Sequence, residues 1–139
     1  MTGGRMGIPL RAILRELNRR NISFAVDSAK LAKLMEWKKN IEKFRNALYY
    51  LEDKADRMKA NFTPELAKKF AREISGFGSK FPFTDKPHDF RVDDGIKRIT
   101  KRLNQNFDSH AAVREGIEVA LSGLRSREKE LEKLIQQER

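Results

Sequence analysis

The sequence predicts an all-α protein: a single-domain helical bundle of about five helices, with one long central helix at about 28–60 and no strand. Apolar residues recur at spacings of three and four along most of the chain, which is the pattern of one helix face. The length of 139 residues suits one domain that buries roughly 68% of its unfolded surface. We therefore expect one helical domain over residues 1–139, with a flexible segment at residues 1–7.

The long central helix has the strongest pattern. A heptad seam begins near a cap at Asp27 or Ser28 and continues to about residue 60. At 1.5 Å per residue this helix is roughly 50 Å long, which exceeds what a compact domain of this size needs. Either part of the seam faces another subunit, or all of it packs inside the bundle. The seam consists of Leu34, Trp37, Ile41, Phe44, Leu48, Leu51, Ala55, Met58 and Phe62.

Two shorter helices flank the long one. The first is predicted over 9–20, with a proline in its first turn and Asn21 as a stop. The third begins with a Thr63 cap followed by Pro64, and it ends at Gly76. A Phe-rich loop at about 76–91 follows. Exposed phenylalanines leave a large apolar surface in water. We therefore expect most of the phenylalanines in this loop to pack against the bundle and anchor the loop there. They are Phe77, Phe81, Phe83 and Phe90.

Two more helices complete the prediction. The fourth starts at a cap on Asp93 or Asp94 and ends near residue 106, and the fifth starts at Asp108 or Ser109 and runs nearly to the C-terminus. Glycines inside the fifth helix suggest that another backbone approaches closely, because glycine costs a helix up to about 1 kcal/mol relative to alanine. This strip favours self-association or a stable protein partner. It consists of Ala112, Gly116, Ala120 and Gly123.

The charge of the chain is strongly basic and unevenly spread. The formal net charge is +10, with 30 Lys and Arg against 20 Asp and Glu. Residues 1–107 have a net charge of +11 and residues 108–139 a net charge of −1. Such a balance favours polyanionic partners, with nucleic acid first, an anionic membrane second and an acidic protein third. The asymmetry predicts one face for a polyanion and a nearly neutral C-terminal element for packing or a protein contact.

The predicted fourth helix contains two basic doublets four residues apart. Residues at i and i+4 are neighbours on a helix, so these cations share the side opposite Ile99, with no acid between Asp94 and Asp108 to neutralise them. A similar ridge runs along the first helix, and the long helix adds cations beside a tyrosine that is able to stack on a base. Three cations of the third helix, Lys68, Lys69 and Arg72, extend the basic character. The candidate nucleic-acid-binding residues are Arg11, Arg15, Arg19, Lys38, Arg45, Tyr49, Lys97, Arg98, Lys101 and Arg102.

Catalytic chemistry has little support. The chain has no cysteine, which excludes disulfides and thiol catalysis and fits a reducing cytoplasm. No apolar run approaches the roughly 18 residues of a membrane span, and no phosphate-cradling motif or nucleophile elbow is present. The tract DKPHDFRVDD is an alternative site, because its acids and histidine have the chemistry to hold Mg²⁺ for a nuclease. The same acids also suit turns and helix caps. We expect no cofactor, no metal and no small-molecule substrate.

In size and composition the chain is similar to the small helical subunits of nucleoprotein assemblies, such as those of CRISPR effector complexes. The tract ITKRLNQNF, followed by a charged helix, also resembles plasmid mobilisation accessory proteins. The residues themselves predict a non-catalytic module that binds nucleic-acid backbone without reading sequence, inside a larger complex or a homo-oligomer. The alternatives are an adaptor or effector whose basic face binds an acidic protein, and a metal-dependent nuclease.

Overall fold

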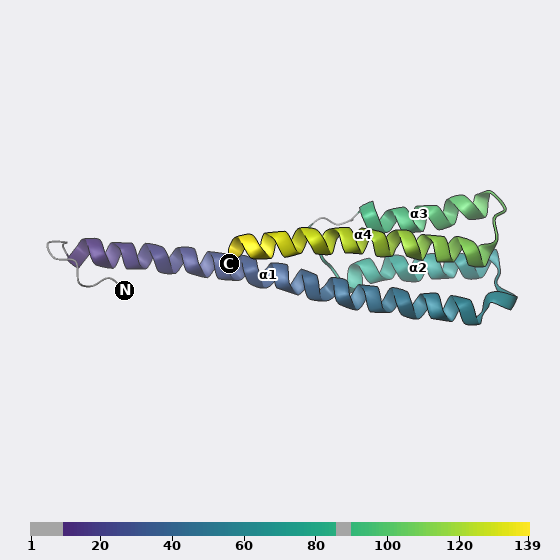
Figure 1. Ribbon diagram of the computed structural model, residues 1–139, viewed down its shortest axis with the longest axis horizontal. Coiled ribbons are helices and arrows are strands. Elements are labelled where there is room, and N and C mark those ends of the chain that lie inside the picture. The colour runs from purple at the N-terminus through teal and green to yellow at the C-terminus, as the bar shows by residue number, and fades with distance from the viewer. Residues whose placement is uncertain (1–9, 86–89) are drawn as a thin grey trace.

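Helices make up almost all of the fold (Figure 1). The computed structural model describes residues 10–85 and 90–139, and it describes side chains in 28–85 and 92–139. Within these ranges the chain is all-α, as predicted, but with four α-helices instead of five. They are α1 (Leu10–Arg57), α2 (Pro64–Lys80), α3 (Phe90–Asn104) and α4 (Ser109–Glu138), with the short 3-10 helix η1 (Lys59–Asn61) between α1 and α2.

The four helices run in alternating directions, and the long helices α1 and α4 form an antiparallel pair (Figure 1). Helix α4 contacts all three other helices, and α2 also contacts α1 and α3. Helices α1 and α3 therefore lie at opposite corners. The C-terminus reaches α1 where Lys30 Nζ lies 2.9 Å from Glu138 Oε1. The first turns of α1 extend past this point.

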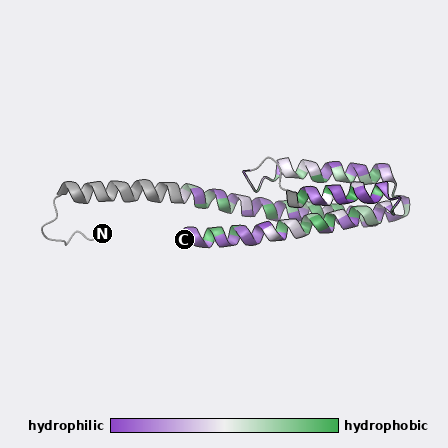
Figure 2. Ribbon diagram, turned by 90° about the horizontal axis from the view of Figure 1, so that it is seen from above, coloured by the Kyte–Doolittle hydropathy of each residue, from purple (hydrophilic) through white to green (hydrophobic). Residues whose placement is uncertain are grey.

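The predicted heptad seam forms the α1 side of the core. Leu34, Ile41, Phe44 and Leu48 are buried, and the seam stays buried as far as Ala55. Its last two members, at positions 58 and 62, are partly buried at the edge of the core. Hydrophobic and hydrophilic segments alternate along the ribbon of each helix (Figure 2). Within the described part, the seam is therefore used inside the bundle.

The predicted break at Asn21 is wrong, because α1 is continuous from Leu10 to Arg57. No glycine or proline occurs in this range. Asparagine itself costs a helix interior only a few tenths of a kcal/mol to about 0.7 kcal/mol. A polar residue alone thus does not end a helix that contains neither glycine nor proline. The predicted flexible residues 1–7 lie outside the described residues.

The Phe-rich loop is shorter than predicted, because α2 continues through Gly76 to Lys80. The added turn places Phe77 against Phe44 of α1, with ring centroids 5.8 Å apart. Phe81 and Phe83 also contact Phe44, at 6.2 Å and 6.0 Å. This aromatic packing outweighs the helix cost of the glycines. The three phenylalanines anchor the segment to the bundle, as expected.

The helix ends follow the predicted capping chemistry in part. Thr63 Oγ1 accepts from Leu66 N at 3.1 Å, and Asp108 Oδ1 accepts from Ala111 N at 2.8 Å. Both caps are confirmed. The predicted cap at Asp93 or Asp94 is wrong, because α3 begins at Phe90 and both acids lie inside it. A loop of four residues then joins α3 to α4.

That loop contains a left-handed residue, Asn106, with φ of 55°. The N–H of Phe107 donates to Arg102 O at 3.0 Å, and the N–H of Asn106 donates to Leu103 O at 3.1 Å. This pair of bonds is the Schellman arrangement, which satisfies the last carbonyls of α3. Asparagine tolerates the left-handed region better than other non-glycine residues. The loop is thus fixed, and it sets how α4 returns along α3.

Two buried glycines allow α3 and α4 to approach closely. A Cβ at Gly95 would lie 2.5 Å from the carbonyl oxygen of Gly116, and a Cβ at Gly116 would overlap Ile99 Cγ1. The expectation that a backbone approaches the small-residue strip is therefore confirmed at Gly116. The approaching backbone is α3 of the same chain, so this part of the strip is already occupied.

Candidate nucleic-acid interface

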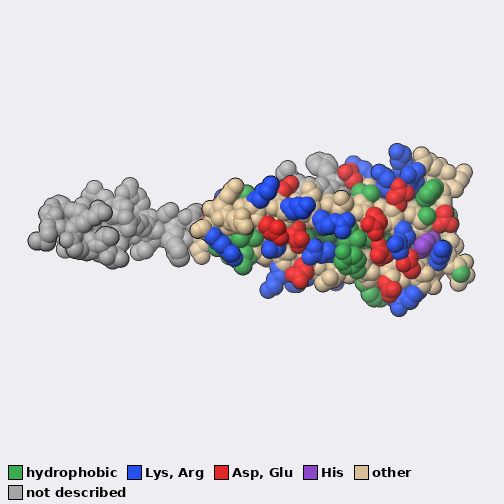
Figure 3. Space-filling model, viewed as in Figure 1, with side chains coloured by type: hydrophobic (Ala, Val, Ile, Leu, Met, Phe, Trp, Pro, Cys, Tyr) green, Lys and Arg blue, Asp and Glu red, His purple; other side chains and the backbone are tan. Residues whose placement is uncertain are grey.

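Ion pairs line the contact between α1 and α4. Arg45 donates to both carboxylate oxygens of Glu128 at 3.2 Å, and Lys38 Nζ lies 3.7 Å from Glu132 Oε1. Together with the Lys30–Glu138 pair, they place cations of α1 against glutamates of α4. In Figure 3 the basic and acidic side chains accordingly alternate along the visible face. The acids of the C-terminal helix thus neutralise part of the basic excess of α1.

The arginines of the two basic doublets on α3 are also paired. Arg98 Nη1 lies 2.6 Å and Arg102 Nη2 lies 2.9 Å from Glu115 Oε1 of α4. Hydrogen bonds from Arg102 and then Arg98 lower the pKa of Glu115 below its ordinary value. Arg102 also lies over the ring of Phe107 at 4.9 Å. The prediction that no acid neutralises the doublets is therefore wrong for both arginines, because their partner belongs to the next helix.

The two lysines of the doublets remain available. Lys97 and Lys101 are exposed, and neither forms an ion pair with another described residue. They are four residues apart, so they lie side by side on the surface of α3. Ile99, which is fully buried, lies on the opposite side of the helix. These lysines match the predicted arrangement of cations opposite the core.

A second row of cations lies on the neighbouring helix α2. Lys68 and Arg72 are exposed one turn apart, on the side of α2 away from the buried Phe70 and Ile74. Within the described residues they have no ion-pair partner, and neither does the exposed Lys69. These three cations contribute to the basic character that the sequence predicts, but they are not among the predicted binding residues. We use the name α2–α3 cation surface for Lys68, Lys69, Arg72, Lys97 and Lys101.

The other candidates do not join this surface. Lys38 and Arg45 lie on α1, at the corner opposite α3, and both are paired with α4. Tyr49 is 45% exposed on α1, which leaves its ring open to solvent. The predicted ridge of Arg11, Arg15 and Arg19 lies outside the described side chains. The structure therefore divides the predicted residues between two separate parts of the bundle.

A further row of exposed cations lies on α4, where Arg125, Lys129 and Lys133 follow one another at single turns. This part of α4 extends beyond the end of α3 in Figure 1. The α4 row therefore lies on a part of α4 that extends past α3. By contrast, the cations of α2 and α3 occupy two helices that pack side by side.

A polar cluster lies at the other end of the α1–α4 contact. His110 Nε2 lies 2.9 Å from Asp56 Oδ1, and Arg114 donates to Asp56 Oδ2. Hydrogen bonds from His110 and Arg114 lower the pKa of Asp56. Burial raises the pKa of Glu52, whose Oε2 atom is buried without a hydrogen-bond partner among the described residues. Arg114 Nη2 lies 4.0 Å from that oxygen.

The alternative metal site falls partly outside the described residues, because His88 and Asp89 belong to 86–89. In the described part, no group of three or more His, Cys, Asp or Glu side chains is arranged to hold a metal ion. A membrane span has no candidate either, since no described helix is both long enough and apolar enough. Comparison with protein-family models, with curated proteins and with solved structures finds no match to this chain.

Proposed function

We propose that this chain is a non-catalytic helical module that binds the phosphate backbone of nucleic acid through its α2–α3 cation surface. One observation carries the proposal. Exposed cations without an acidic partner among the described residues form a row on each of two neighbouring helices, Lys68 and Arg72 on α2 and Lys97 and Lys101 on α3. Two rows on neighbouring helices offer more phosphate contacts than a single helix does.

The chemistry of these side chains suits backbone contact better than base reading. Lysine is a flexible point charge, and it binds phosphate without the planar geometry that base edges require. The two arginines of α3 pair with Glu115 instead, so on α3 the residue type that most often reads guanine is already engaged within the protein. Binding should therefore be similar on DNA or RNA of any sequence and should weaken as salt rises.

A charge-reversal pair tests this proposal. In fluorescence anisotropy titrations with labelled oligonucleotides, the variant Lys97→Glu/Lys101→Glu should bind at least about tenfold more weakly than the parent. The matched control is Lys129→Glu/Lys133→Glu on α4, which makes the same change of charge at the same spacing. Both variants should melt as the parent does, because surface substitutions usually stay within about 0.5 kcal/mol.

The comparison between the two variants decides the outcome. A loss that is confined to the α3 variant supports the α2–α3 cation surface. Equal losses in both variants would show a response to net charge alone and would overturn the assigned surface. No detectable binding by the parent protein, together with capture of an acidic protein through Lys97 and Lys101, would replace the proposal with the adaptor function.

A further inference from the structure

The outer side of α1 carries a second stripe with heptad spacing. Its residues recur at intervals of three and four, as those of the core seam do, but all of them are exposed. At about 100° per residue the stripe lies on the side of α1 away from the core seam. Met35, 47% exposed, and Tyr49 are among the few large hydrophobic side chains that the described part exposes. The stripe consists of Ala32, Met35, Lys39, Glu42, Asn46 and Tyr49.

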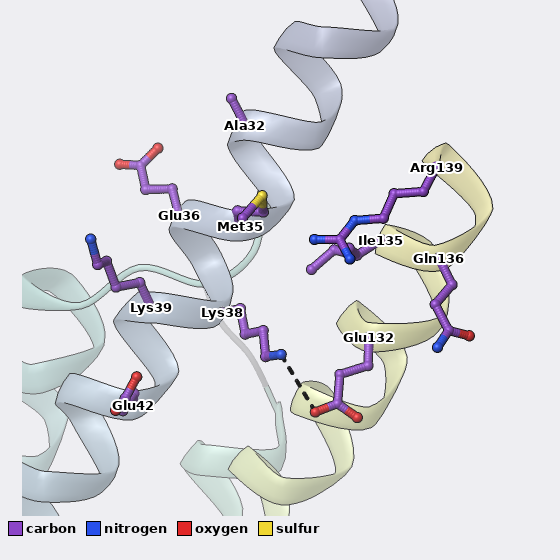
Figure 4. Close-up of a pocket in the computed structure, with 10 residues that line it drawn as sticks. All are labelled: Ala32, Met35, Glu36, Lys38, Lys39, Glu42, Glu132, Ile135, Gln136 and Arg139. Atoms are coloured by element: carbon purple, nitrogen blue, oxygen red, sulfur yellow. Dashed lines mark ion pairs between the residues drawn. The ribbon is translucent and has the colours of Figure 1, made fainter.

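A groove of about 650 Å³ opens beside one end of this stripe, between α1 and the last turns of α4. Met35 and Ile135 contribute its apolar surface, and the Lys38–Glu132 ion pair bridges the two helices (Figure 4). In Figure 1 the last turns of α4 pair with α1 beyond the ends of α2 and α3. This two-helix part of the molecule has a side that no other described helix covers.

We propose that a second copy of the chain docks on this stripe, with its α1 antiparallel to the first. The order of the charges along the stripe favours a second copy of the chain as the binding partner. In a pairing centred between positions 39 and 42, Lys39 lies opposite the partner's Glu42, and the two-fold symmetry repeats the contact. A parallel pairing in register would place Lys39 against Lys39 and Glu42 against Glu42. Opposite charges therefore favour the antiparallel register.

The same register gives matched contacts in the neighbouring layers. Met35 lies opposite the partner's Asn46, and the small Ala32 lies opposite the partner's Tyr49. Each layer thus pairs a longer side chain with a shorter one, which suits interdigitation. A polar asparagine in such a seam lowers affinity but fixes the register and the number of strands. This homodimer does not depend on nucleic-acid binding, because its stripe lies on α1, at the corner opposite α3.

Charge swaps on the stripe test the proposal by sedimentation velocity over a range of protein concentrations. Lys39→Glu, or Glu42→Lys, converts two attractive contacts to repulsive ones and should raise the dimer dissociation constant about tenfold or more. The double variant Lys39→Glu/Glu42→Lys exchanges both charges and should restore the parent's dissociation constant. The control Lys129→Glu, on α4 away from the stripe, should leave dimerisation unchanged.

Cross-linking gives a second readout, because the chain has no cysteine of its own. Under mild oxidation, a mixture of Lys39→Cys and Glu42→Cys proteins should form mixed dimers faster than either protein forms dimers alone. A disulfide requires Cα atoms roughly 4.4–6.8 Å apart, so it forms readily only between residues that face each other across the seam. A parent that sediments as a monomer at every concentration would overturn the proposal. So would single swaps without effect, or a Lys39→Cys protein that cross-links with itself in preference to the Glu42→Cys protein.

Discussion

Replacing Gly95 with alanine tests the close approach of α3 and α4. The added Cβ would lie 2.5 Å from Gly116 O, and 3.1 Å from both Cβ and N of Ala120. Non-bonded carbon atoms pack best at about 3.5–4.0 Å, so the helices must separate by roughly 1 Å. The nearest obstacle is backbone, which has no other rotamer. We therefore place the cost at the upper end of the usual 1–3 kcal/mol for overpacking, about 3 kcal/mol.

Part of that cost is offset, because alanine favours a helix over glycine by about 1 kcal/mol. The net expectation is a loss of about 2 kcal/mol in the free energy of unfolding. Gly76→Ala is the matched control, since a Cβ there meets nothing within 4 Å on α2. That variant should gain up to about 1 kcal/mol. The same chemical change thus has opposite signs at the two positions.

Urea denaturation followed by far-ultraviolet circular dichroism measures both variants. A Gly95→Ala protein as stable as the Gly76→Ala protein would show that α3 and α4 do not pack at this distance. It would also weaken the pairing of Glu115 with the α3 arginines, since the same helix contact places those side chains together.

Three further predictions concern stability. Leu48→Ala should cost about 2–5 kcal/mol because Leu48 is fully buried in the α1 seam, and an unchanged melting temperature would refute that packing. Glu52→Gln should raise the melting temperature at neutral pH. Burial raises the pKa of Glu52, so its carboxylate opposes folding above that pKa, and the gain should vanish in acid. Glu115→Gln should lower stability at neutral pH, because the arginines lower the pKa of Glu115 in the folded state. This loss should shrink as the pH falls from the ordinary glutamate pKa through the lowered pKa of Glu115, because protonation removes the charge that the arginines stabilise. Thermal melts across pH measure both effects.

The seam and the caps at Thr63 and Asp108 were predictable from sequence because their patterns are local. The spacing of Leu34, Ile41 and Leu48 indicates which side of the helix is apolar. Thr63 and Asp108 are only three residues away in sequence from the N–H groups that they cap. The continuity of α1 differs from the prediction because asparagine, unlike glycine or proline, does not by itself end a helix. The length of α2 was missed because Gly76 was read without the aromatic contacts that follow it.

The candidate site was harder to predict because pairing between helices depends on their register. Glu115 and Arg102 are 13 residues apart in sequence, and only the Asn106 turn and the packing of Gly95 on Gly116 bring their side chains together. Helix periodicity alone correctly placed Lys97 and Lys101 on the outer side. It did not show that α2, which carries Lys68 and Arg72, packs against α3, because the neighbour of α3 is known only once the bundle is assembled.

The salt dependence of nucleic-acid binding tests the central claim most directly. For duplex DNA, the logarithm of the binding constant should fall linearly with the logarithm of salt concentration, and each phosphate contact should contribute about 0.9 to the slope. Lys97→Ala and Lys101→Ala should each reduce the slope by about that amount on any sequence, while Lys129→Ala should leave it unchanged. Slopes that are identical in the parent and both α3 variants would contradict the proposal that the α2–α3 cation surface contacts phosphate.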